Sequence, residues 1–384
     1  MTLRPGHTVA RLAVCTALAA GAVVATPAAA WAHGVGGVGP SNYETVITST
    51  RPDVPGVELR AVDLGDRLEL TNDTERDVVV LGYDGEPYLR VGPNGTFENV
   101  RSPATYVNRT RAGNDPVPDR ADSDAAPVWR KVNGESVARW HDHRSHWMAR
   151  GDAPAVRADP DRPHVVQRFE VHLLQGDTPI VVRGAVRWVP GASPWFWIAV
   201  AFVLAALVVA CSRTAQARVA VVIALLGVIV AETLHVIGAW NATTEGTGTK
   251  VGASMYAVGA VVASIVAMVW VVRRGVHAAA PLVLIAGLFV AIAGGLADLS
   301  VLSRSQLPTT LSTDTARAIV ATALGLGAGL AIVGALRLRP EPTRRRRDQA
   351  VDPAGDPGAE GPDEGAAGES WPSTQSWHSS SSVT

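Results

Sequence analysis

The chain has 384 residues, of which 47% are hydrophobic and only 5% aromatic, and its formal net charge is −1. A charge this close to zero gives no overall field that would attract nucleic acid, so no nucleic-acid partner is expected. Of its two cysteines, Cys15 lies in the leader and Cys211 at the edge of an apolar segment. The region between them therefore has neither a disulfide framework nor a thiolate zinc site.

The first 32 residues have the pattern of a secretory signal peptide. Two arginines precede an apolar run from Leu12 to Thr26, and Ala30-Trp31-Ala32 has the small-x-small form of a cleavage site. An uncleaved first helix is the alternative. Cleavage after Ala32 would leave His33 at the amino terminus, where its amine and imidazole could ligate one metal ion together. Nitrogen ligands of this kind suit Cu(II). If cleavage falls elsewhere, His33 is an ordinary residue.

Residues 33–192 are predicted to form an extracytoplasmic β-sandwich domain. Short alternating runs such as "VELRAV" and "RLELTN" are typical of half-buried strands. Asp84-Gly85 and Asn94-Gly95 have hairpin-turn chemistry, and residues 101–135 are polar enough to form a long surface loop. The runs "HVVQRFEVHLL" and "IVVRGAVRWV", separated by "QGDTP", predict a closing hairpin. Regularly spaced strands without helical periodicity favour a sandwich.

The stretch "ARWHDHRSHWMAR", residues 138–150, carries three histidines, and we call it the histidine stretch. His141 and His143 are two residues apart, so on a strand both side chains face the same way, whereas His146 needs a turn to join them. Imidazoles in this arrangement are typical ligands of copper and zinc. Asp142 could be a further ligand, or could orient a ligand's second nitrogen. This reading predicts a metal site at His33, His141, His143, His146 and Asp142.

Two arginines in the same stretch favour a different interpretation. Arg139 and Arg144 are fixed positive charges that would repel a dication. They fit a structural network of aspartate, arginine and histidine, packed by Trp140 and Trp147. A binding site for a partner or an anion is the third alternative.

Five apolar segments follow the β domain, each close to the ~20 residues that a helix needs to cross a bilayer. They cover residues 195–211, 219–240, 251–272, 278–299 and 316–336. The predicted fold class is therefore β plus membrane α, in which the sandwich precedes a five-helix transmembrane bundle over residues 193–338, and the lipid bilayer is a predicted partner.

The basic residues predict how this bundle is oriented in the plasma membrane. Loops that carry Arg213 and Arg218, then Arg273 and Arg274, then the arginines from 337 onward alternate with loops poor in basic residues. By the positive-inside rule the arginine-bearing loops are cytoplasmic, which agrees with a leader that exports the β domain. Residues 339–384 are rich in charge, glycine, proline and serine, and are predicted to be a disordered cytoplasmic tail.

Three ionisable residues lie in the predicted membrane spans, where a charged side chain costs several kcal/mol of free energy. Glu232 and His235 are three apart in the second span and so share a helical face, and Asp298 ends the fourth span. One interpretation is an outward-facing polar cavity that receives a cation or proton. The other is a hydrogen-bonded pair between helices, with Asp298 reaching the headgroups.

The blocks "VVVLGYDGEPYLRVGPNGTFENVRSPATYVNRTR" and "RWHDHRSHWM" resemble a family of actinobacterial membrane proteins to which no activity is assigned. That resemblance implies the architecture above. A looser similarity, carried by His33, His141 and His143, exists to CopC/CopD-like copper-handling proteins. Met148 is the only methionine beside the cluster, and Asp142 and His143 are adjacent rather than spaced as Asp-x-His, so the chain departs from that pattern.

These observations lead to two expectations for function. The first is an integral plasma-membrane protein whose exported domain binds a metal ion, with copper favoured and zinc as the alternative, linked to passage of an ion or proton. The second is a non-catalytic scaffold or sensor in which the histidine cluster is structural and the domain binds another envelope protein. No nucleophile elbow, phosphate-binding glycine loop or dinucleotide fingerprint follows a strand, so an enzyme is not expected.

Overall fold

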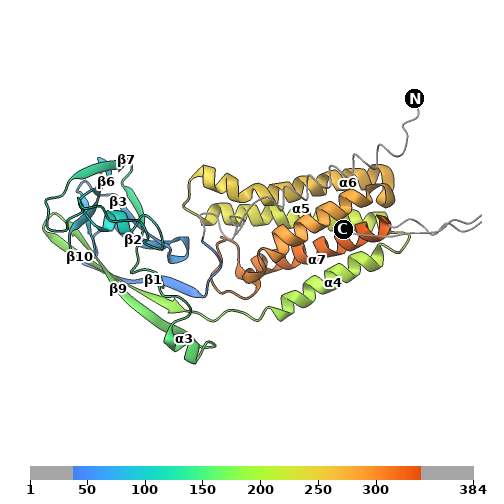
Figure 1. Cartoon of the computed structure of the whole chain (residues 1–384), viewed down its shortest axis with the longest axis horizontal. Coiled ribbons are helices and arrows are strands. Elements are labelled where there is room, and N and C mark those ends of the chain that lie inside the picture. The colour runs from blue at the N-terminus through green and yellow to red at the C-terminus, as the bar shows by residue number, and fades with distance from the viewer. Residues whose placement is uncertain (1–37, 339–384) are drawn as a thin grey trace, which may run out of the picture. The chain divides into compact units, whose positions relative to one another are not determined.

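A computed structural model of the chain describes residues 38–338 (Figure 1). The predicted signal peptide, His33 and the predicted tail over residues 339–384 lie outside the described residues. Within them, an antiparallel β domain precedes a helical region, as the sequence predicts.

The β domain contains two antiparallel sheets, with strand orders β1-β10-β9-β4-β5-β6-β7 and β2-β3-β8. The strands are β1 (Tyr43–Arg51), β2 (Val57–Val62), β3 (Arg67–Asn72), β4 (Val78–Leu81), β5 (Pro87–Gly92), β6 (Gly95–Asn99), β7 (Trp129–Asn133), β8 (Val137–His141), β9 (His164–Gln175) and β10 (Thr178–Trp188). The runs chosen by alternation all form strands, because a residue pattern of period two places one set of side chains on the buried face.

One apolar core lies between these sheets. Leu68 and Leu70 of β3 have no exposed surface, and they belong to the same cluster as Val171 and Leu173 of β9 in the larger sheet. The antiparallel β domain is therefore confirmed, with a core drawn from both sheets.

The prediction of a long surface loop over residues 101–135 is wrong in part. The segment contains a helical turn, α2 (Ala104–Val107), and strand β7. Thr105 and Tyr106 of that turn are buried, and their hydroxyls donate to the carbonyls of Asn99 and Val100 at 2.6 and 3.0 Å. Tertiary contacts order a segment that has too few apolar residues to show a periodic pattern.

The helical region has three long apolar helices able to cross a membrane, rather than the five that were predicted, among the residues described. The elements are α4 (Trp195–Cys211), α5 (Ala217–Ala242), α6 (Thr247–Phe289), its π-helical continuation η3 (Val290–Leu296), the 3-10 turn η4 (Leu299–Leu302) and α7 (Thr313–Leu338). The difference arises because α4 has only 17 residues and because one helix, running to Leu296, takes up two predicted spans.

That long helix reverses direction at Gly275, whose φ of 83° and ψ of 168° are not helical. Positive φ is accessible to glycine because it has no Cβ. Gly259 consequently lies against the ring of Phe289, although the two are 30 residues apart in sequence. In a straight helix they would be about 45 Å apart. The predicted segments 251–272 and 278–299 thus belong to two antiparallel arms, and the arginine-bearing residues between them are helical except at Gly275.

Helix α7 lies at the centre of the helical region, where 67% of its most apolar stretch is buried. Its glycines allow backbones to approach closely. Gly325 faces the backbone of Ala201 in α4, whereas Gly327 on another face meets Ala291 of η3.

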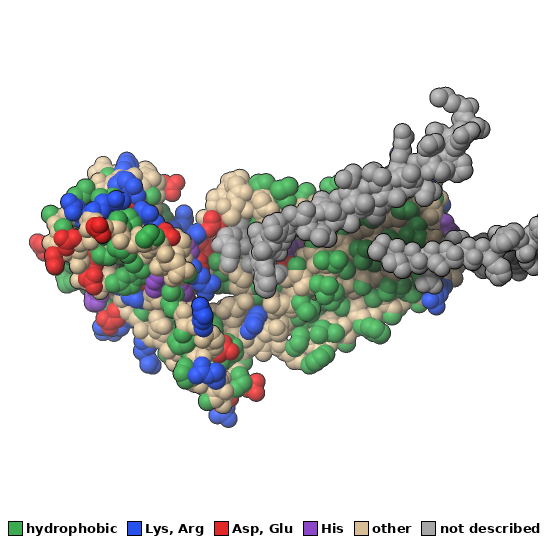
Figure 2. Space-filling view, in the orientation of Figure 1, with side chains coloured by type: hydrophobic (Ala, Val, Ile, Leu, Met, Phe, Trp, Pro, Cys, Tyr) green, Lys and Arg blue, Asp and Glu red, His purple; other side chains and the backbone are tan. Residues whose placement is uncertain are grey.

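The outer surface of the helices is apolar. Figure 2 shows hydrophobic side chains along the helical region, whereas most charged side chains gather over the strands. Phe202, Ile223 and Val258 are among the large apolar residues that are more than half exposed. A surface of this kind is stable in hydrocarbon and costly in water, so these helices suggest a multi-pass protein of the lipid bilayer.

Candidate functional site

The histidine stretch begins on β8 and continues into a turn that lies against η2 (Asp63–Gly65), the short connection between β2 and β3. His141 is the last residue of β8, where it pairs with Arg67 of β3. Ser145 donates through its hydroxyl to the carbonyl of Gly65 at 3.2 Å, which joins the turn to η2. The two segments thus bring polar side chains of distant sequence positions together.

Asp142 is fully buried and its oxygens are occupied. The guanidinium of Arg144 donates two hydrogen bonds to its carboxylate, at 2.9 and 2.8 Å, and the indole of Trp140 donates a third at 3.0 Å. Burial opposes the charged guanidinium, but the carboxylate of Asp142 outweighs it and raises the pKa of Arg144. Charge-assisted hydrogen bonds of this kind are roughly twice as strong as those between neutral groups.

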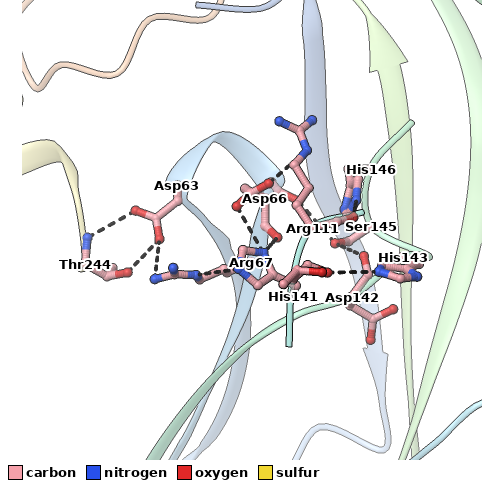
Figure 3. Close-up of polar contacts among 12 residues, drawn as sticks. Asp63, Asp66, Arg67, Arg111, His141, Asp142, His143, Ser145, His146 and Thr244 are labelled. Atoms are coloured by element: carbon pink, nitrogen blue, oxygen red, sulfur yellow. Dashed lines mark hydrogen bonds and ion pairs between the residues drawn. The ribbon is translucent and has the colours of Figure 1, made fainter. Parts of the chain in front are cut away.

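His141 also has partners on both ring nitrogens. Nδ1 lies 3.1 Å from the carboxylate of Asp66, and Nε2 lies 3.5 Å from the guanidinium of Arg67 (Figure 3). Asp66 is in turn paired with Arg111 at 3.0 Å. Burial tends to raise the pKa of Asp66, but the hydrogen bond from His141 and the charge of Arg111 prevail and lower it.

His143 and His146 contact each other edge to face, with ring centroids 5.8 Å apart. Their Nε2 atoms lie 3.3 Å from the backbone carbonyls of Thr110 and Arg111 respectively. Nδ1 of His146 is buried with no hydrogen-bond partner among the residues described. Burial and the charge of Arg111 lower the pKa of His146, so its neutral form is favoured.

Within residues 38–338 no group of three or more histidine, cysteine, aspartate or glutamate side chains is placed to hold a metal ion. The described part of the histidine stretch has the geometry of the predicted structural network. A metal site that includes His33 remains a prediction, because that residue lies outside the described part of the chain.

Figure 3 shows that the network continues from the β domain to the connection between α5 and α6. Arg67 forms an ion pair with Glu245, and the carboxylate of Asp63 accepts hydrogen bonds from the backbone and hydroxyl of Thr244, at 3.1 and 2.6 Å. Asp63 has a φ of 51°, which is uncommon for a residue with a Cβ and is maintained here by tertiary contacts.

Sequence reasoning missed Asp63, Asp66, Arg67 and Arg111 as parts of this network. Arg111 ends the first of the two blocks quoted above, but the other three lie in no motif, and all four are charged residues of strands and turns. The available signal was "DLGD" before β3, where a glycine between two aspartates indicates a tight turn that presents carboxylates.

The three predicted intramembrane polar residues do lie together. Nε2 of His235 is 3.7 Å from the carboxylate of Asp298, and both line a cavity of about 60 Å³. Glu232, one turn further into α5, is 2% exposed, and its Oε1 has no hydrogen-bond partner among the described residues. Ser254 and Thr309 are its other polar lining residues, and the rest of the lining is apolar.

Comparison of the chain with protein-family models, with curated proteins and with solved structures finds no match. Function is therefore argued from the geometry of these two groups of residues.

Proposed function

We propose that this chain is a plasma-membrane sensor or scaffold, without catalytic activity, whose exported β domain is joined to a transmembrane bundle by a structural histidine network. The domain faces the outside, where another envelope protein is the proposed partner, and the carboxyl terminus is cytoplasmic. The helices make five crossings, because α6 contributes two arms and α4 adds a short one.

The observation that carries this proposal is the position of Arg67. Its guanidinium lies beside His141 in the β domain and forms an ion pair with Glu245 near the outer end of α5. His141, one of the predicted metal ligands, is thereby part of the contact that joins the β domain to the helical region. A conformational change at the histidine stretch would alter this contact and so affect the helices, which is what a sensor requires.

The proposed orientation is supported by contacts at the other end of the helices. Arg337 of α7 contacts His277 at 2.6 Å and donates to the carbonyl of Ser212, which follows α4. The guanidinium of Arg218 lies beside Gly275. The segments that were predicted to be cytoplasmic thus meet at one end, where positive charge favours the inner face of the membrane.

Metal titration of the full-length protein in detergent tests this proposal against copper or zinc binding. We expect neither Cu(II) nor Zn(II) to show sub-micromolar binding that is lost in the His141→Ala/His143→Ala variant. We expect the same variant to lose about 1–3 kcal/mol of stability, because Asp66 loses a buried partner. His172→Ala, at an exposed position on β9, is the control. Tight binding that disappears in the double variant would favour the metal function instead.

A further inference from the structure

We propose that Glu232 is a proton-binding site within the helical region, reached from the outer side through the cavity of His235 and Asp298. This site goes beyond the proposed function, which assigns no ligand to the membrane part. A proton bound at Glu232 would convert the buried carboxylate to a neutral acid.

The carboxylate of Glu232 lies against small residues that have no polar side chain. Its Oε1 lies against Gly294 of η3, so close that a Cβ at that glycine would be 2.0 Å away, and Ala323 of α7 lies beside the same glycine. Neither neighbour offers a side-chain donor. Burying a charged carboxylate with an oxygen that accepts no hydrogen bond costs several kcal/mol, and taking up a proton removes most of that cost.

A proton fits this place better than a metal cation does. Calcium, a typical hard cation, takes about six to eight oxygen ligands. Glu232 supplies one carboxylate next to a glycine and an alanine, and the carboxylate of Asp298 is paired with His235. No group of three or more metal-binding side chains is placed around it within residues 38–338.

The π-helical turn η3 makes room for the carboxylate. Ala297 donates to the carbonyl of Ile292, five residues earlier, which widens the helix where Gly294 and Gly295 face its neighbours. Turns of this kind are frequent at functional sites. The missing side chain at Gly294 is the space that the acid occupies.

The cavity that His235 and Asp298 line lies on the Trp240 side of Glu232. His235 lies one turn above Glu232 toward Trp240, and Asp298 lies one turn beyond Gly294. Glu232 is about 12 Å below Trp240, at 1.5 Å per residue. The cavity's ~60 Å³ exceeds what one water molecule needs, so water can bring a proton to this pair.

The charged groups that surround the site are few. On α5 the nearest is His235, and after η3 it is Asp298. Arg317 on α7 is held by Asp314 at 3.3 Å and by the carbonyl of Arg304 at 3.0 Å. Lys250 on α6 donates to the carbonyl of Trp240 at 3.0 Å. Of these groups, Asp298 is the one whose charge acts on Glu232.

Infrared difference spectroscopy of the full-length protein in liposomes tests the site, with pH as the variable and the proton as the only added ligand. We expect a carbonyl band of a protonated carboxylic acid that is absent in Glu232→Gln and retained in Glu58→Gln, an exposed acid of β2. Asp298→Asn should keep the band but change the pH at which it appears.

Two results would overturn the proposal. One is a band that persists unchanged in Glu232→Gln, and the other is loss of the wild-type band when sodium or copper ions are added at constant pH. Should Glu232→Gln fail to fold, Glu232→Asp serves in its place, and its acid band must be present at a different frequency. None of these outcomes depends on whether the histidine stretch binds a metal.

Discussion

The residues of the histidine stretch show how a side chain's function depends on partners that its own sequence neighbourhood does not reveal. The same residues of the stretch predicted both a metal site and an arginine–aspartate–histidine network. Arg144 does bind Asp142 within the stretch, but the partners of His141 and His146 are Asp66 and Arg111, which are distant in sequence. Such contacts follow from tertiary packing, which residue type alone cannot specify.

His146 should make the stability of the protein depend on pH. Its pKa in the folded state lies below the ordinary value of 6.5, so the unfolded chain binds the proton first as pH falls. Stability is then fully present above that value and decreases as pH drops toward the folded pKa. Asp66 acts in the same direction at lower pH, because its pKa is also lowered, from 3.8. Melting temperatures of the purified protein over a pH series should show the decrease. His146→Asn should reduce the part of this decrease that begins near pH 6.5, and His172→Asn should leave it unchanged.

Among the elements, those with a clear period were the most predictable. The strand runs and α4 were located closely, since periodicity and apolar length follow directly from burial. Two predictions were wrong. Residues 101–135 contain a helical turn and a strand instead of forming one long loop, and α6 continues through two predicted spans. Arg273, Arg274 and Gly275 predict a short loop between two helices, whereas the structure reverses the chain at Gly275 alone and the residues on both sides of it remain helical.

Glycines of α7 offer a test of packing at the element scale. A Cβ at Gly325 would lie 2.4 Å from the backbone oxygen of Ala201, which cannot move without shifting α4. Gly325→Ala should therefore destabilise the helical region by about 1–3 kcal/mol, as overpacked cores do. Gly252→Ala is the matched control, since nothing lies within 4 Å of that position in α6, and there alanine should be neutral or stabilising. Thermal unfolding in detergent distinguishes the two, and equal effects would show that α4 and α7 do not pack as described.

For the whole molecule, the arrangement of the crossings depends on the reversal at Gly275. If α6 has two antiparallel membrane arms, Thr249 and Ser312 lie outside the cell, while Ala215 and Arg274 lie inside. Single cysteines at these exposed positions, placed in a Cys15→Ser/Cys211→Ser chain, can be labelled with a membrane-impermeant thiol reagent. We expect Thr249→Cys and Ser312→Cys to react in intact cells, and Ala215→Cys and Arg274→Cys to react only after the membrane is opened. Reaction of Arg274→Cys from outside would mean that α6 does not cross twice. Protection of Thr249→Cys would contradict the orientation itself, because the arginine-poor segment would then face the cytoplasm.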